Sequence, residues 1–233
     1  MKGLRTVVMS AVLAASVAVV PIWSVATAQR VDQVVSQTVP QMLFQVANPA
    51  SLTAHEIVTE YSGKILTTIE EGREKFEDNP ELLTKDLLVL LDPVVDFESI
   101  SKAVMGKHRK VATPEQREKF AEVFKLTMVR LYTKALVTLG VKKVLVLDEE
   151  KSEDRSSDRA KVVMEVGATD ETSYSVIYTM RRNKEKEWRV RNMILDGINL
   201  GLTYLNQFDS AMNRHEGDIE KVIASWGTEE TDE

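Results

Sequence analysis

Two different hydrophobic periodicities divide the chain near residue 140. Before that point, apolar residues recur three and four positions apart, which indicates amphipathic helices. Four of the expected helices start behind a residue whose side chain can accept hydrogen bonds from the first free backbone amides, namely Thr53, Asn79, Asp96 and Thr113. We therefore predict helices from 54 to about 77, from 80 to the Asp92-Pro93 pair, from 97 to Gly106 and from 114 to 139.

Beyond residue 140 the period changes to two, which indicates strands with one buried face. We expect strands at about 142–148, 160–167, 173–181 and 187–195. The links between them are short or charged, so they predict hairpins and an antiparallel sheet. The alternation places these apolar residues on one face: Val162, Met164, Val166, Tyr174, Val176, Tyr178, Met180, Trp188, Val190 and Ile194.

Helical spacing returns after the last expected strand. An Asp196-Gly197 turn leads into a helix whose apolar stripe would contain Ile198, Leu202, Leu205, Phe208 and Met212, and a short helix follows at about 219–226. Helices first and a sheet second predict an α+β fold, with a four-stranded antiparallel sheet packed against a helical layer.

The ends of the chain differ in composition from its middle. Lys2 and Arg5, a short apolar run and the small residues before Gln29 are typical of a signal peptide over residues 1–28, cleaved after Ala28. We divide the rest into a polar arm 29–51, a single domain 52–226 and an acidic tail 227–233. The expected location is the periplasm.

Composition excludes several classes of function. Without the expected signal peptide the chain has 28 basic and 36 acidic residues, a net charge of −8, which argues against binding to nucleic acid. Because the chain has no cysteine, it has no disulfide, catalytic thiol or thiolate metal site. Its three histidines lie in separate segments, and the acid-rich stretch 148–158 lacks the ligand spacing of a calcium loop. We expect no cofactor and no metal.

What the pattern leaves is apolar surface on the sheet and on several helices. A filled core and an apolar pocket use the same residue types, and the pattern alone favours the filled core.

Two blocks of sequence change that balance, because they resemble the MlaC/toluene-tolerance family. The first contains Asp92-Pro93-x-Val95-Asp96-Phe97 and continues through Met105-Gly106 to Phe120; the second is the strand–strand–helix run from Thr172 to Phe208. Together they span about residues 52–226. The resemblance implies a curled sheet with an apolar cavity between it and the helices. It also implies a carrier of diacyl phospholipid and not an enzyme. One departure is Leu205, in a stretch where many relatives carry arginine.

The family resemblance also implies partners. A carrier of this kind would move phospholipid between an inner-membrane ATP-driven complex and an outer-membrane lipoprotein–porin complex, and so maintain outer-membrane lipid asymmetry. We expect partner docking through the basic cluster Lys107, Arg109 and Lys110. We expect lipid contacts on the apolar stripes and the sheet face, at Phe97, Val104, Met105, Phe120, Phe124, Met128, Tyr132, Val162, Met164, Val166, Val176, Tyr178, Trp188 and Val190.

Two other classes of function stay open. An enzyme of the isomerase or hydratase type, on a similar cone-shaped α+β fold, would need an acid or a tyrosine with a strongly shifted pKa inside the cavity. Within the two blocks that resemble the family, the acids placed near strand or helix ends are Asp96 and Asp196, which are better explained as a helix cap and a turn residue. The other alternative is an interaction protein with a filled core.

Overall fold

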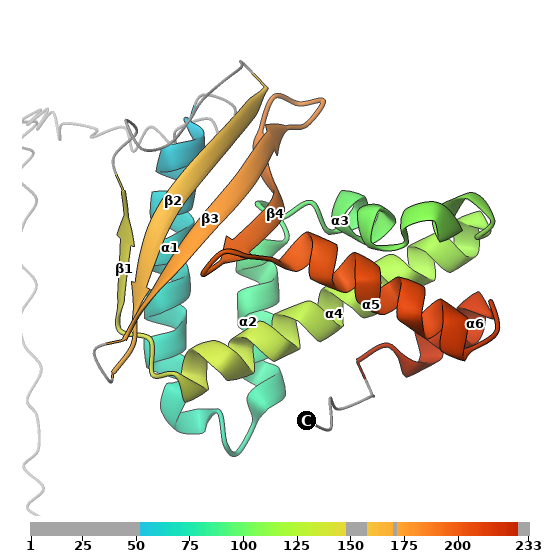
Figure 1. The fold of residues 1–233 in the computed structure, drawn as a ribbon. Helices are drawn as coiled ribbons and strands as arrows, with labels where there is room; N and C mark the ends of the chain where they lie inside the picture. The colour runs from blue at the N-terminus through green and yellow to red at the C-terminus, as the bar shows by residue number, and fades with distance from the viewer. Residues whose placement is uncertain (1–51, 148–157, 170–171, 228–233) are drawn as a thin grey trace, which may run out of the picture. The chain divides into compact units, whose positions relative to one another are not determined.

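The structure, a computed structural model, describes residues 52–147, 158–169 and 172–227 (Figure 1). The expected signal peptide and polar arm lie outside the described residues, as do the acid-rich loop up to residue 157 and the acidic tail beyond Gly227. All the described residues fall within one compact unit. Across these ranges, no helix combines the length and the hydropathy that a membrane span needs.

The first half of the described chain is helical. Helix α1 spans Ala54–Gly72 and continues into the short 3₁₀ helix η2, Arg73–Lys75. Helices α2 (Pro80–Leu91) and α3 (Phe97–Val104) follow, and the 3₁₀ helix η3 (Gly106–Lys110) leads to the long helix α4 (Pro114–Thr138).

Local capping explains where these helices begin. The Thr53 and Thr113 side chains each accept a hydrogen bond from the backbone amide three residues on. The side chains of Glu56 and Gln116 in turn accept a hydrogen bond from the amides of Thr53 and Thr113. These two capping boxes confirm the expected helix starts. Asn79 and Asp96 cap α2 and α3 in the same way from single side chains. Helix α4 ends before Gly140, whose φ of 61° suits a residue without a Cβ.

The sheet has five strands, one more than expected. Strands β1 (Lys143–Val146), β2 (Arg159–Gly167), β3 (Ser173–Arg182) and β4 (Trp188–Leu195) match the predicted four, and the two-residue β5 (Ile198–Asn199) follows. The order is β1-β2-β3-β4-β5 and every pairing is antiparallel.

The short strand β5 corrects the expected start of the last long helix. Asp196 and Gly197 both have positive φ, 46° and 82°, which makes a tight two-residue hairpin that pairs Leu195 with Ile198. Ile198 is therefore 59% exposed in the sheet and does not belong to a helical stripe. Helix α5 spans Leu200–Arg214 and is capped by Asn199, and α6 spans Ile219–Ser225.

A bulge in β4 corrects one face assignment. Met180 pairs with Val190 but Thr179 pairs with Asn192, so Arg191 is an extra residue on β4. The insertion reverses the alternation beyond it: Met193 and Leu195 pair with Tyr178 and Val176, while Ile194 pairs with Ile177 on the other face. The placement of Ile194 with Trp188 and Val190 was wrong for this reason.

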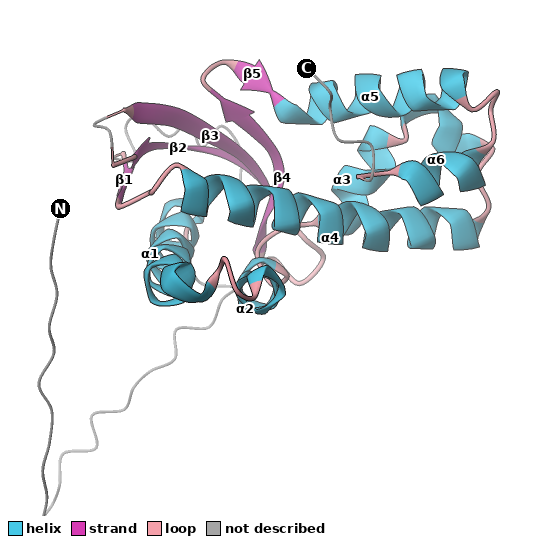
Figure 2. Ribbon diagram, turned by 90° about the horizontal axis from the view of Figure 1, so that it is seen from below, coloured by secondary structure: helices cyan, strands magenta, loops and turns pink. Residues whose placement is uncertain are grey.

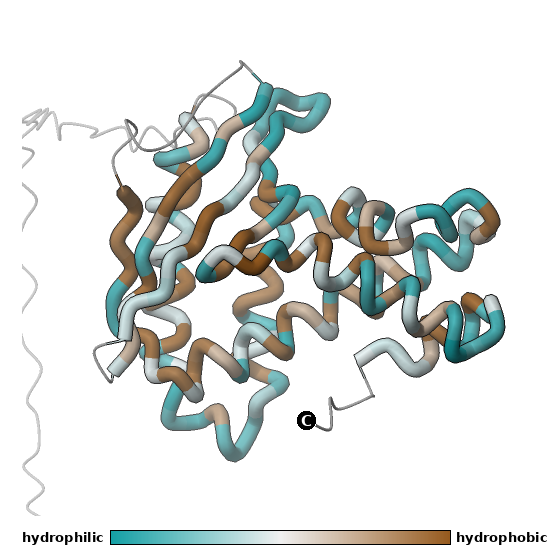
Figure 3. The backbone as a smooth tube through the Cα atoms, viewed as in Figure 1, coloured by the Kyte–Doolittle hydropathy of each residue, from teal (hydrophilic) through white to brown (hydrophobic). Residues whose placement is uncertain are grey.

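The helices form two groups. In Figure 2 the sheet curves over α1, and α2 and the C-terminal half of α4 lie on the same side of it. The N-terminal half of α4 packs with α3, α5 and α6 in a second group. Hydrophobic residues recur along α1, α4 and the strands, whereas the hairpin between β3 and β4 is hydrophilic (Figure 3).

The buried apolar residues form three clusters. One lies between the sheet and α1, the second joins α1, α2 and α4, and the third fills the second helical group around Phe120 and Phe208, both fully buried. Residues of helix α4 belong to or pack against all three clusters, so this helix links the sheet to both groups of helices.

Candidate ligand-binding site

An apolar cavity of about 330 Å³ lies between the inner face of the sheet and the helices, within the size range of ligand pockets in proteins. Its wall is built from α1, α2, α3, α4, strands β1 to β4 and the first turn of α5. Among the described residues that form this wall, none is an Asp, Glu, Lys, Arg or His. The cavity is therefore suited to a ligand part without charge.

The cavity lies where the three packed clusters meet. Phe124 and Met128 belong to the helical cluster, Val129 to the cluster of α1, α2 and α4, and Met164 and Val176 to the sheet cluster, yet all five line the wall. Side chains from all three clusters thus surround one space that they do not fill. The expectation of a filled core from pattern alone does not hold.

Nine of the fourteen expected lipid contacts line this cavity. They are Phe97, Phe124, Met128, Tyr132, Met164, Val166, Val176, Tyr178 and Val190. Their role as lipid contacts stays a prediction, but their position on one continuous wall is a property of the fold.

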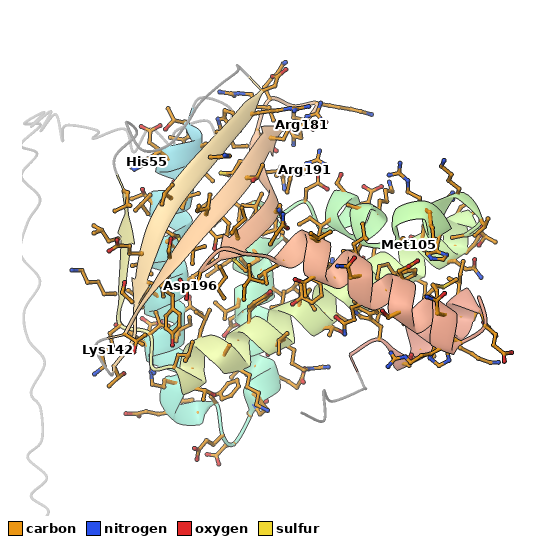
Figure 4. All side chains as sticks on the ribbon, viewed as in Figure 1. His55, Met105, Lys142, Arg181, Arg191 and Asp196 are labelled. Atoms are coloured by element: carbon orange, nitrogen blue, oxygen red, sulfur yellow. The ribbon has the colours of Figure 1, made fainter. Side chains whose placement is uncertain are left out.

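The other five expected contacts lie in packed core. Val104, Met105 and Phe120 belong to the helical cluster, where the Phe120 ring lies 4.8 Å from that of Phe208. Figure 4 labels Met105 at the end of α3 that points away from the sheet. Val162 and Trp188 belong to the sheet cluster. Arg182 covers the Trp188 ring at 4.5 Å. Helical and strand periodicity marks all of them as buried but cannot distinguish a cavity wall from filled core.

A second set of wall residues was not expected from the sequence. They come from α1, α2, the bulged part of β4 and the start of α5, and include Ser62, Ile65, Leu66, Ile69, Leu87, Leu91, Asn192, Met193, Leu195, Leu200 and Tyr204. Ile65 and Ile69 have the spacing of one helical stripe, but nothing in the sequence indicates that this stripe faces the strands.

Most polar groups on the wall are satisfied by the protein itself. Thr133 donates to the carbonyl of Val129 at 2.7 Å, and Asn192 accepts from the amide of Gly201 at 3.0 Å. The hydroxyls of Tyr132 and Tyr204 lie 3.0 Å apart and join α4 to α5. Burial raises the pKa of all three tyrosines Tyr132, Tyr178 and Tyr204, that of Tyr178 to about 12.

These groups do not support the enzyme alternative. A raised tyrosine pKa moves the hydroxyl further from the neutral range in which a general acid or base operates. Asp96 caps α3 and lies 3.1 Å from Arg191, which Figure 4 shows on the strand beside that helix. Asp196 accepts from the amide of Ser175 at 2.7 Å in the β4–β5 turn. Both acids therefore have the structural roles expected of them.

The three histidines are dispersed, as expected. His55 contacts the carbonyl of Leu147 at the start of α1, His108 pairs with Asp209, and His215 contacts Ser225. Within the described ranges no group of three potential ligands could hold a metal ion.

The expected docking cluster lies on η3, beside the second helical group. Lys107, Arg109 and Lys110 are all exposed. Lys107 forms an ion pair with Asp209 of α5 at 2.8 Å, whereas neither Arg109 nor Lys110 has an acidic partner among the described residues. Leu205, the departure from the family pattern, packs near the start of this cluster, since a Cβ on Gly106 would lie 3.6 Å from it.

Known proteins that are similar to this chain point to the family that the two sequence blocks resemble. The family described as MlaC protein matches residues 59–228. The toluene tolerance protein ttg2D of Pseudomonas putida is 35% identical over 187 residues, covering 80% of this chain and 85% of that protein. The intermembrane phospholipid transport system binding protein MlaC of Haemophilus influenzae is 24% identical over 152 residues, 65% of this chain and 71% of that one.

A solved structure has the same fold. The phospholipid-binding protein from Ralstonia solanacearum, determined in complex with a phospholipid, superimposes with a TM-score of 0.59 at 21% identity, covering 75% of this chain and 98% of that one. The α+β fold with a curved antiparallel sheet is thereby confirmed, with five strands in place of four. From the family match and the 35% identical relative, we conclude that this chain belongs to the MlaC family.

Proposed function

We propose that the protein is a periplasmic phospholipid carrier that holds the acyl chains of a diacyl phospholipid in the cavity beneath the sheet. The observation that carries this proposal is the cavity itself, with a wall that is apolar and without charged side chains in the described residues. Membership of the MlaC family and the phospholipid in the related Ralstonia structure support it.

The energetics of acyl chains suit a passive carrier. Burial of each CH₂ stabilises the complex by about 0.8 kcal/mol, so each acyl carbon that enters the cavity strengthens the binding relative to water. A membrane interior offers nearly the same gain, so transfer between carrier and membrane is close to balanced. The direction of lipid transfer must therefore come from partner proteins. This agrees with a cavity wall that has no charged side chain among the described residues.

The proposed partners are an inner-membrane ATP-driven complex and an outer-membrane lipoprotein–porin complex, between which the carrier would maintain outer-membrane lipid asymmetry. The basic cluster of η3 supports a docking role, because Arg109 and Lys110 are exposed on a chain that is acidic overall. Charged groups of this kind accelerate encounter more than they add affinity.

The direct test is the lipid content of the protein purified from its native host. Mass spectrometry of an organic extract should find about one diacyl phospholipid per chain. A matched sample of an unrelated periplasmic protein, purified in the same way, controls for lipid carried over from membranes. A phospholipid content no higher than in that control would refute the carrier function.

A further inference from the structure

Two hydrogen-bond donors on the cavity wall have no acceptor among the residues that the structure describes. The Tyr132 and Tyr204 hydroxyls share one hydrogen bond, which uses one of their two protons, and in the described part of the chain the other proton has no partner. The Tyr178 hydroxyl on β3 makes no hydrogen bond to any described residue either. All three tyrosines are half-buried and line the cavity, so an acceptor on a ligand that fills it can bond with these free donors.

The surroundings hold these rings in place. The Tyr204 ring packs edge-on against Phe124 at 5.8 Å, and its hydrogen bond ties it to Tyr132. Tyr178 is fixed in the middle of β3, where it pairs with Val162 on one side and Met193 on the other. Burial raises the pKa of each hydroxyl, so all three stay protonated, and remain donors, at any pH near neutrality.

The charge of the wall selects among the acceptors that a phospholipid offers. A phosphate inside the cavity would bring a negative charge into an apolar site where no described wall residue is cationic, and the desolvation of an unpaired charge costs several kcal/mol. A neutral ester carbonyl needs only a neutral donor. The phosphate therefore stays outside, and the acyl–glycerol linkage is the acceptor that can enter.

The geometry points to an ester-recognition subsite: Tyr178 donates to one acyl ester carbonyl of the phospholipid, and the Tyr132–Tyr204 pair donates its free proton to the other. This inference rests on the proposed carrier function and adds that the cavity recognises the acyl ester linkages of the lipid. It fixes the depth to which the lipid enters, because the glycerol linkage must stop at the tyrosines. It also makes the carrier selective for ester-linked over ether-linked lipid, since an ether has no carbonyl.

The test is a competition that does not depend on how much protein is folded. The full mature chain is stripped of lipid and loaded from vesicles with equal amounts of diacyl and dialkyl-ether phosphatidylglycerol of the same chain length. Mass spectrometry then gives the ester-to-ether ratio of the bound lipid. The compared proteins are wild type, Tyr178→Phe, the double variant Tyr132→Phe with Tyr204→Phe, which removes both hydroxyls of the pair, and the control Tyr61→Phe, whose ring lies outside the cavity wall beside Lys64.

We expect the ratio to fall by about threefold to tenfold in Tyr178→Phe and in the Tyr132→Phe, Tyr204→Phe double variant, the factor that one neutral hydrogen bond provides, and to stay at the wild-type value in Tyr61→Phe. If all four proteins bind both lipids in the same ratio, the ester subsite is refuted while the carrier function stands. If the wild-type protein takes up neither lipid, the carrier function fails, and the subsite with it.

Discussion

Filling the cavity with a protein side chain should displace cargo without damaging the fold. Val176 lies in the middle of the sheet and lines the cavity, between its cross-strand neighbours Met164 and Leu195, which also line it. In Val176→Phe the new ring would project into empty space. Overpacking a filled core costs about 1–3 kcal/mol, but here we expect the stability of the lipid-free protein to change by less than about 1 kcal/mol.

The same substitution should weaken lipid binding strongly. Phenylalanine adds four carbons to the valine side chain, and each acyl carbon that they exclude loses about 0.8 kcal/mol of burial. The total is about 3 kcal/mol, or on the order of a hundredfold in Kd for a diacyl phospholipid. Urea unfolding of the lipid-free protein and titration with a fluorescent phospholipid measure the two effects separately.

Two neighbouring positions supply matched controls. Val162→Phe places the same ring in packed core, where Val162 is 1% exposed, and should lower stability by about 1–3 kcal/mol. Ile177→Phe places it on the opposite face of the same strand and should leave lipid affinity unchanged. If Val176→Phe is as destabilising as Val162→Phe and binds lipid like the wild type, the cavity is closed in solution and the reasoning fails.

Three further predictions concern parts outside the cavity. Phe208→Ala should lower the free energy of unfolding by about 3–5 kcal/mol without changing the lipid bound per folded chain, because its ring fills the helical cluster; a loss below 1 kcal/mol in urea unfolding would contradict that packing. Contacts with Lys107 and the adjacent histidine lower the pKa of Asp209, so its contribution to stability is present above the pKa of the unfolded chain and is lost as the pH falls through the lower folded value. Asp209→Asn should therefore flatten the decline in melting temperature below about pH 4, and a decline as steep as that of the wild type would argue against the contact. Arg109→Glu with Lys110→Glu should keep lipid occupancy but slow transfer to membrane-bound partner complexes, most at low salt, and an unchanged transfer rate would place docking elsewhere.

Much of the fold follows from interactions that are short in sequence. The caps of α1, α2, α3 and α4 are made between residues three apart, so each helix start could be predicted from the residues beside it. The strands were equally clear, because a half-buried strand must alternate. The two blocks that resemble the family led to the expectation of a cavity and of a phospholipid ligand. Periodicity indicates neither of these.

The misassigned elements depend on pairing between distant segments. The bulge at Arg191 coincides with backbone hydrogen bonds from Val190 to Val94 and from Asp96 to Val190, which tie β4 to the segment between α2 and α3. Past the bulge, Ile194 lies on the other face of the sheet and Met193 lines the cavity. Similarly, Ile198 has the spacing of a helical stripe but pairs with β4 instead.

The local sequence was enough to place the starts of helices α1 to α4 and the first four strands, and it excludes thiol chemistry. Which apolar residues are buried, which of them touch each other and which face the cavity depend on contacts between distant segments. Phe120 and Phe124 lie one helical turn apart on α4 with the same chemistry, yet only Phe124 lines the cavity. Phe120 packs against the rings of Phe208 and Trp226, at 4.8 and 5.2 Å, which come from distant segments of the chain. No local pattern encodes contacts of this kind.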